Sequence, residues 1–378
     1  MASLPLPSDA LLEGQTALPA AYAFLPLETR SATAQYPPRV VFIEVTNHCN
    51  LLCETCPRTF VSYETPKTLA WDEFVRVVEQ FPDMQRAVLH GIGEPLINHD
   101  LPRMIAHLKA RGVTVLFNSN ATLLTTDWAG RLIDSGLDEL RVSIDGADPA
   151  TYARIRGAPL LHKIVQNLTN FTRLQRELGA AHPRVSIWMT GMRENIAELP
   201  ALVRLAARMD VREVYVQRLV YYLDRAAPSE LTEPGRTLFD DFDALADRLI
   251  AEAETVAREV GVTLRASGAT DPRHSLEAGE RHRRAHKPTA PRSDPEPRPW
   301  AACRRPWTTA YVTANGNCLP CCISPFATSD YERLKLGNLL ERPFAEIWND
   351  ERYQQWRVEL LSDQPPKPCQ GCGVHWSL

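Results

Sequence analysis

The apolar positions of the chain repeat a pattern of two alternating elements. Near-continuous runs of Val, Ile and Leu are typical of strands that are covered on both faces of a sheet, and six segments carry such runs: 40–45, 87–93, 113–120, 137–145, 184–191 and 213–219. The stretches between them place apolar residues at helical spacing; these are 71–81, 101–112, 125–136, 161–179 and 196–209. This alternation of strands and helices predicts an α/β fold built on a parallel sheet.

The pattern changes after the sixth strand. A further helical stretch is expected within residues 234–261, followed by a Pro- and Arg-rich segment that we interpret as a flexible linker. Its His274, His282 and His286 are expected to be solvated rather than to bind metal. The stretch AYVTANGNCLPCC then predicts a hairpin around Asn315–Gly316. The predicted units are an N-terminal extension (1–37), an α/β domain (38–225), a helical connection (226–265), the linker (266–299) and a small C-terminal domain (300–378).

Composition narrows the class of partner. The 378 residues are 44% hydrophobic and 23% charged, and 42 basic against 46 acidic residues give a formal net charge of -4. A slightly acidic chain gives no reason to expect nucleic acid or an anionic membrane as a partner. No apolar run approaches the roughly 20 residues of a membrane-spanning helix, and the N-terminus lacks the pattern of a secretion signal. We therefore expect a cytoplasmic protein.

The nine cysteines form two groups, Cys49 to Cys56 and Cys303 to Cys372. Tight groups in a large chain indicate metal or cluster binding rather than a disulfide framework. The first group, in TNHCNLLCETCPRTF, contains Cys49, Cys53 and Cys56. Three thiolates are one too few for a closed zinc site. A four-iron cluster held by three thiolates, in contrast, leaves one iron open to another ligand.

This Cx3Cx2C motif directly after a first parallel strand resembles that of the radical SAM superfamily. Further landmarks follow in the same order: GIGEP at 91–95, FNSNATLL after the third strand, SIDGADPATYARIRG after the fourth and GMRENIAEL after the fifth. The resemblance covers residues 38–222 and implies a partial (β/α)6 TIM-like barrel. It also implies a [4Fe-4S] cluster on Cys49, Cys53 and Cys56 that binds S-adenosylmethionine (SAM).

The same resemblance assigns expected roles to single residues. It implies that Gly91, Gly93 and Glu94 meet the methionyl amino group and that Ser143 and Arg156 hold the carboxylate, a task that suits the forked guanidinium. Asn120 and Asn195 occupy two further positions of the SAM site. The sequence departs from the family pattern at Thr55, where an aromatic or large apolar residue often lies against the adenine.

The second cysteine group resembles the SPASM and Twitch modules that carry auxiliary clusters. Its pattern is Cys303-x12-Gly316-x4-Cys321 followed by Cys369-x2-Cys372. The resemblance implies a small β-hairpin/helix domain with one auxiliary [4Fe-4S] cluster on Cys303, Cys321, Cys369 and Cys372. Four thiolates would also suit structural zinc. Cys318 and Cys322 are spare; we expect them to pack inside the hairpin, and the alternative is that one is a ligand or a hydrogen-atom donor to a substrate radical.

The implied activity is reductive cleavage of SAM to a 5'-deoxyadenosyl radical, which abstracts hydrogen from an unactivated C–H bond, with an electron donor such as flavodoxin or ferredoxin. The sequence favours a small polar metabolite of the sugar, aminocyclitol or nucleoside type, in a net oxidation or epimerisation. A peptide-modifying maturase is the alternative, and a non-catalytic iron-sulfur or zinc protein is a second one. Six residues at strand ends are candidates for the substrate site: His90, Met189, Gln217, Arg218, Tyr221 and Tyr222.

Overall fold

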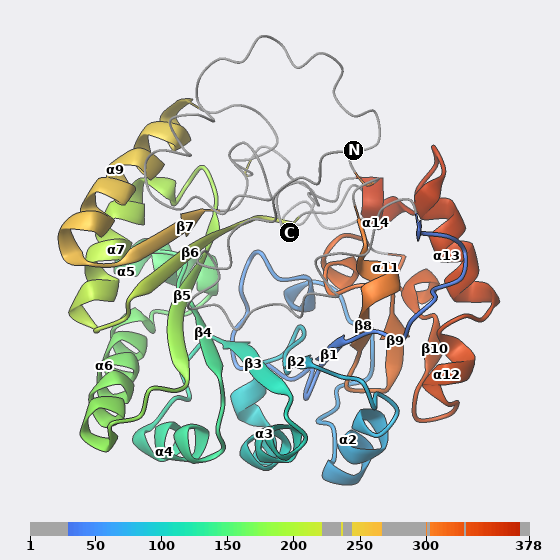
Figure 1. Cartoon of the computed structure of the whole chain (residues 1–378). Coiled ribbons are helices and arrows are strands. Elements are labelled where there is room, and N and C mark those ends of the chain that lie inside the picture. Colours follow the sequence, from blue (N-terminus) through green and yellow to red (C-terminus); the bar gives the residue numbers. More distant parts are fainter. Residues whose placement is uncertain are drawn as a thin grey trace, which may run out of the picture.

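A ten-stranded sheet forms the centre of the protein (Figure 1). The computed structural model describes residues 29–220, 236, 244–266, 300, 303–328 and 330–370. The strand order is β10-β9-β8-β1-β2-β3-β4-β5-β6-β7. Strands β1 to β7 pair in parallel with their neighbours, so their carboxyl ends meet at one edge. The predicted α/β class is confirmed.

All six predicted strands are present. They are β1 (Val40–Ile43), β2 (Arg86–Val88), β3 (Thr114–Ser119), β4 (Glu139–Ser143), β5 (Arg184–Gly191) and β6 (Glu213–Arg218). The prediction of 87–93 for the second was too long, because the chain leaves the sheet after Val88 and forms a loop. The residues that resemble a SAM site therefore lie in loops beyond the strand ends, where ligands bind in parallel sheets.

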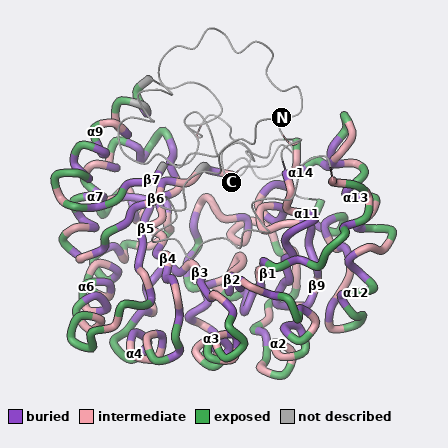
Figure 2. Tube along the Cα trace, viewed as in Figure 1, coloured by how far each residue is buried: buried purple, intermediate pink, exposed green. Residues whose placement is uncertain are grey.

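Helices cover the outer, convex face of the curved sheet, as Figure 1 shows. Those of the barrel are α2 (Trp71–Val78), α3 (Leu101–Ala110), α4 (Thr126–Asp134), α5 (Pro149–Arg156), α6 (Leu161–Leu178), α7 (Leu199–Arg208) and α9 (Ala244–Val260). Each long helix turns an apolar face inward; α2, for example, buries Phe74, Val77 and Val78. Figure 2 shows this as purple on the sheet side and green on the outside.

A seventh parallel strand extends the predicted barrel. Helix α9 leads into β7 (Thr263–Ala266), which pairs with β6 in the register Glu213↔Thr263. The helical prediction for 234–261 is confirmed over Ala244–Val260. The linker was predicted at 266–299; Ala266 instead ends β7, and residues 267–299 lie outside the described residues.

The C-terminal region continues the same sheet. Strand β8 (Thr309–Val312) pairs in parallel with β1, and β9 (Asn317–Leu319) and β10 (Gly337–Asn338) follow antiparallel. The predicted hairpin at Asn315–Gly316 is confirmed, with Gly316 at φ +86° in the left-handed region that favours glycine. The short helices here are α11 (Arg305–Thr308), α12 (Phe344–Ile347), α13 (Glu351–Leu361) and α14 (Lys367–Gln370).

One continuous hydrophobic core runs from the barrel into the C-terminal region. It includes Val41 and Phe117 of the barrel together with Tyr311 and Trp356 of the C-terminal part. The C-terminal region is therefore fixed against β1 rather than attached only through the connecting chain. Among the described residues, no helix combines the length and apolar character that crossing a membrane requires.

Candidate active site

The loop after β1 carries the first three cysteines to the mouth of the barrel. Cys49, Cys53 and Cys56 all line one cavity of about 310 Å³. The main-chain N–H of Cys56 donates to the carbonyl of Cys53 at 3.1 Å, so the last two cysteines lie on one tight turn. The structure thus brings together the three residues that the sequence predicts as cluster ligands.

Arg58 holds this loop in shape. Its Nε donates to the carbonyl of Asn47 at 3.0 Å, and Nη2 donates to the carbonyl of Cys49 at 3.0 Å. A third bond runs from Nη1 to the carbonyl of Leu51 at 3.3 Å. One guanidinium therefore fixes the backbone on both sides of Cys49. Sequence reasoning missed this role, because Arg58 lies just beyond the motif and nothing local marks its partners.

The thiols suit a metal cluster by their chemistry. Burial raises the pKa of Cys56 to about 12 and also raises the pKa of Cys49. Binding of a metal requires the thiolate, so loading the site releases protons. Within the described part of the chain, no three His, Cys, Asp or Glu side chains are grouped to hold a single metal ion. In an iron-sulfur cubane each thiolate binds a different iron, and three soft donors on one loop fit such a cluster.

Glu94 of the GIGEP stretch is buried beside the cysteine loop. Its Oε1 accepts hydrogen bonds from Ser119 Oγ at 2.8 Å and from the N–H of Leu96 at 3.1 Å. Its Oε2 accepts from the N–H of Asn120 at 2.7 Å. Burial raises the pKa of Glu94 above its ordinary value. The carboxylate lines the cavity, yet most of its acceptor capacity serves to join the β2 and β3 loops.

The two glycines of this stretch allow the loop after β2 to lie close to the loop after β1. A Cβ on Gly91 would lie 2.0 Å from Glu44 Oε2, and a Cβ on Gly93 would lie 2.1 Å from the carbonyl of Thr46. Both glycines also line the cavity. Packing against the β1 loop alone is therefore sufficient to require glycine at both positions.

The ends of β3 and β4 supply polar groups to the cavity, as expected. Asn120 and Ser143 both line it. The Asn120 amide donates to Asn50 Oδ1 at 2.9 Å and lies 3.9 Å from Cys49 Sγ. Asn120 is therefore positioned to support the cysteine loop as well as to contact a ligand.

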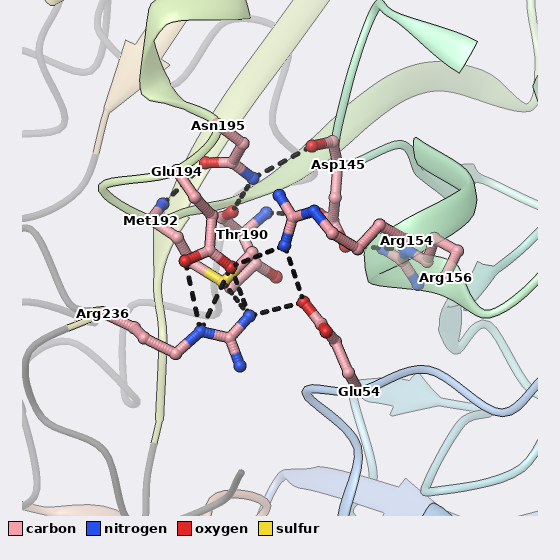
Figure 3. A network of polar contacts seen from close by, with 9 residues as sticks. All are labelled: Glu54, Asp145, Arg154, Arg156, Thr190, Met192, Glu194, Asn195 and Arg236. Carbon is pink, nitrogen blue, oxygen red and sulfur yellow. Dashed lines mark hydrogen bonds and ion pairs between the residues drawn. The ribbon is translucent and has the colours of Figure 1, made fainter. Parts of the chain in front are cut away.

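Arg156 lies at the C-terminal end of α5 and lines the cavity; Figure 3 shows it beside Asp145. Its Nε is 2.6 Å from Asp145 Oδ2, and its Nη1 is 4.0 Å from Cys53 Sγ. Burial opposes the charge, but Asp145 and Cys53 outweigh it and hold the pKa of Arg156 above its ordinary value. The guanidinium is thus a fixed cation next to the cysteine loop, a fitting partner for a ligand carboxylate.

Asn195 is placed differently from the other predicted residues. It is fully buried and does not line the cavity. Its Nδ2 donates to the carbonyls of Asp145 and Thr190, both at 2.9 Å, and its Oδ1 accepts from the N–H of Met192 at 2.8 Å (Figure 3). These hydrogen bonds join the loops after β4 and β5, and the Asn195 side chain does not reach the lining of the cavity.

Two of the predicted substrate-site residues line the cavity. His90 accepts a hydrogen bond at Nδ1 from the N–H of Asn118 at 3.2 Å, and burial lowers its pKa to about 3. His90 is therefore neutral, with its proton on Nε2. Gln217 donates to Thr190 Oγ1 at 3.2 Å. Met189 instead is fully buried in the core; the Arg218 side chain, Tyr221 and Tyr222 lie outside the description.

The C-terminal region closes one side of the same cavity. Cys322, Ile323 and Phe326 all line it. Arg305 Nη1 lies 2.9 Å from Cys322 Sγ, and burial raises the pKa of this thiol to about 11. Cys322 is partly buried and packs against the core, and it also lines the cavity.

Cys318 lies away from this cavity. It is fully buried in the core, its Sγ is 3.1 Å from the hydroxyl of Tyr353, and it does not line the cavity. Burial raises its pKa to about 12. This location supports the packing interpretation for Cys318.

Three of the four predicted auxiliary ligands converge at a second, smaller cavity. Cys303, Cys321 and Cys369 line this space of about 20 Å³ together with Arg305 and Trp356. Burial raises the pKa of Cys303 to about 11. The fourth predicted ligand, Cys372, lies outside the described residues. The thiol donors present fit an auxiliary iron-sulfur cluster.

Two family models match the chain. Residues 43–206 match the radical SAM superfamily, and residues 303–373 match the SPASM iron-sulfur cluster-binding domain. These matches confirm the resemblance that the sequence motifs indicated, and they imply [4Fe-4S] clusters and SAM as cofactors.

Two curated relatives match over almost the whole chain. The chain is 25% identical over 354 residues to the PqqA peptide cyclase of Xanthomonas axonopodis pv. citri, covering 89% of this chain and 80% of that protein. It is 24% identical over 363 residues to the AdoMet-dependent heme synthase of Nitratidesulfovibrio vulgaris, covering 93% and 89%. A tungsten-containing aldehyde ferredoxin oxidoreductase cofactor-modifying protein of Pyrococcus furiosus is 26% identical over 185 residues. That match spans 48% of this chain and only 52% of the relative.

A solved structure supports the fold. Streptococcus suis SuiB bound to the precursor peptide SuiA superimposes with a TM-score of 0.60 at 15% identity, covering 88% of this chain and 76% of SuiB. The overall fold is thus shared with SuiB. The chain is therefore an enzyme that contains a radical SAM domain followed by a C-terminal SPASM iron-sulfur domain.

Proposed function

We propose that this enzyme modifies a peptide. The observation that carries the proposal is similarity over almost the whole chain, C-terminal domain included, to a PqqA peptide cyclase. The shared fold with SuiB, whose structure holds a precursor peptide, is consistent with it. The sequence favoured a small polar metabolite, and the comparisons instead favour the alternative that it left open.

The lining of the cavity supports this substrate class. Among the described residues, two charged side chains line the cavity, Glu94 and Arg156. Both interact with other residues of the protein. The remaining lining consists of uncharged polar groups and apolar side chains, including His90, Thr190, Gln217, Leu219, Ile323 and Phe326. Amide donors and acceptors beside apolar surface suit a peptide segment.

We assign the SAM-binding cluster to Cys49, Cys53 and Cys56, and the SAM carboxylate to Arg156 and Ser143. When bound, the cluster and SAM supply a reductive cleavage that gives methionine and a 5'-deoxyadenosyl radical able to take hydrogen from an unactivated C–H bond. Arg58 holds the cysteine loop, and Asp145 orients Arg156. Glu94 and Asn120 line the cavity next to this loop. We assign the auxiliary cluster to Cys303, Cys321, Cys369 and Cys372.

Cys322 is our candidate for a hydrogen-atom donor, because it is the spare cysteine that lines the cavity. In that role its S–H bond breaks, the hydrogen atom forms a C–H bond on the substrate radical, and a thiyl radical remains. One electron from a flavodoxin- or ferredoxin-type donor and one proton then restore the thiol. A cytoplasmic location is consistent with such a donor. This step gives a redox-neutral change such as epimerisation. Without it, the substrate radical would pass one electron to an iron-sulfur acceptor and one proton to solvent, which gives a net oxidation.

The test uses a synthetic peptide encoded by a short reading frame beside the gene, with deuterium on all side-chain and Cα carbons. We expect deuterium in the 5'-deoxyadenosine that forms and a mass change in the peptide under anaerobic, reducing conditions. If 5'-deoxyadenosine forms without deuterium and the peptide mass does not change, this peptide is not the substrate. Deuterium transfer from a labelled sugar or aminocyclitol instead would overturn the peptide proposal and restore the small-metabolite one.

A further inference from the structure

Glu54, which lies between Cys53 and Thr55 in the cysteine loop, is engaged in a compact network of charges (Figure 3). Arg236 Nη2 lies 2.6 Å from Glu54 Oε1. The same guanidinium contacts Glu194, which follows β5, through Nε at 3.1 Å and through Nη2. Arg154 of α5 reaches both carboxylates at longer distances, 3.3 Å to Glu54 and 3.5 Å to Glu194.

Of the two arginines, Arg236 forms the shorter ion pair with Glu54 and is the less exposed. Its side chain is 12% exposed, whereas that of Arg154 is 49% exposed. Its main-chain carbonyl also accepts a hydrogen bond from the N–H of Arg193 at 3.1 Å. Ion pairs between exposed side chains have a small interaction energy, and shorter, less hydrated pairs have a larger one. Arg236 therefore neutralises most of the negative charge of Glu54 and Glu194.

The location of the network connects it to the cysteine loop. The main-chain N–H of Glu54 donates to the carbonyl of Ile155 at 3.0 Å, so the loop rests on the C-terminal end of α5. That end of α5 also carries Arg156, which lies 4.0 Å from Cys53 Sγ. Arg236 lies in the connection between β6 and α9 of the barrel. It thus ties the loops after β1 and β5 to this connection.

We propose that Arg236 is a positioning residue of the radical SAM site, which neutralises the Glu54 and Glu194 carboxylates and so sets the electrostatic environment of the cluster on Cys49, Cys53 and Cys56. Negative charge near a cluster disfavours its reduction, because the reduced cluster carries one more electron. Arg236 therefore keeps the reduction potential of the SAM-binding cluster within reach of its electron donor. This inference concerns the cluster and does not depend on the peptide substrate.

The test is an EPR-monitored redox titration of the reconstituted full-length protein, following the signal that changes when SAM is added. We expect Arg236→Gln to shift the midpoint potential of this cluster to a more negative value, because among the described residues the exposed Arg154 is then the one cation paired with Glu54 and Glu194. Arg236→Lys, which keeps the charge, should shift it less. In the double variant Arg236→Gln, Glu54→Gln, one of the carboxylates is also neutral, and the potential should return toward that of the wild type.

Arg204→Gln is the matched control, since Arg204 forms an exposed ion pair with Glu259 at 3.7 Å on the outer helices. It should leave the potential unchanged. An unchanged potential in Arg236→Gln with full iron content would overturn the proposal. If Arg236→Gln instead fails to retain the cluster, recovery of iron and of the wild-type potential in the double variant supports it. Equal loss of iron in the single and double variants would show a merely structural role and overturn it.

Discussion

The hydroxyl of Tyr311 donates a hydrogen bond to Oε2 of Glu44 at 3.2 Å. Glu44, 2% exposed, comes directly after β1, and Tyr311 belongs to β8 of the C-terminal region. The same carboxylate accepts from the N–H of Ile92 at 2.8 Å and from the N–H of Ala314 at 3.3 Å. One buried acid therefore joins the barrel, the glycine-containing loop beside the cluster site and the C-terminal hairpin.

Replacing Tyr311 by Phe should lower the free energy of unfolding by roughly 1 kcal/mol, because a buried carboxylate loses one donor. Urea denaturation of the anaerobic holoprotein measures this. Tyr36→Phe, at an exposed position, is the control and should have no effect. Equal stability of Tyr311→Phe and wild type would show that this contact does not help to hold the two parts together.

The pH dependence of stability should report on Glu44. Burial raises its pKa from the usual 4.5 to about 7. The folded state therefore favours the protonated acid, so the contribution of Glu44 is complete below about pH 4.5 and is lost as the pH rises through 7. Between about pH 6 and about pH 8 the wild type should lose about 1 kcal/mol that Glu44→Gln does not lose. Parallel pH profiles of urea midpoints for the two proteins would contradict this.

The first six strands of the barrel were predictable from the sequence because each of them carries its own local signal. Runs such as VVFIEV and RVSIWMTG mark β1 and β5 without reference to other parts of the chain. Strand β7 has only the short stretch Thr263–Ala266, and its identity as a strand comes from pairing with β6. The docking of β8 on the free edge of β1 likewise depends on a long-range contact that no local pattern expresses.

In the candidate site, too, local motifs predicted some residues, and residues that act through long-range contacts were missed. Cysteine spacing and the GIGEP stretch led to residues that do line one cavity, because each motif lies in the loop directly after a parallel strand. The groups that hold these loops were missed, among them Glu44, Arg58 and Arg236. Their partners are mostly main-chain carbonyls and amides or distant side chains, and composition or spacing carries no sign of such bonds. Cys318 and Cys322, four residues apart, face different surroundings for the same reason.

Arg58→Met should impair retention of the first cluster, because the carbonyls of Asn47, Cys49 and Leu51 lose their shared donor while the aliphatic volume is kept. After anaerobic reconstitution we expect iron to fall from about eight toward about four atoms per chain. Arg131→Met, which removes a surface arginine bonded to the carbonyl of His99, should keep the full amount. Full iron content in Arg58→Met would rule out this role.

The two spare cysteines should behave differently when each is changed to Ala. Cys318→Ala should lower stability by about 1 kcal/mol, because it leaves a small void and removes the contact with Tyr353, without loss of iron or product. Cys322→Ala should keep its iron but lose the incorporation of solvent deuterium into the product, since the donor thiol exchanges with D2O. Mass spectrometry of the product formed in D2O measures this. A wild-type product free of solvent deuterium would remove Cys322 as the donor.

The account depends most on the assignment of Cys49, Cys53 and Cys56 as the ligands of the cluster that binds SAM. The direct measurement compares wild type with the variant in which all three are Ala, for iron content and for 5'-deoxyadenosine formed from SAM with dithionite. We expect about eight iron atoms per chain and SAM cleavage in the wild type, and about four atoms with no cleavage in the variant. Full iron content or continued formation of 5'-deoxyadenosine in the variant would contradict the assignment.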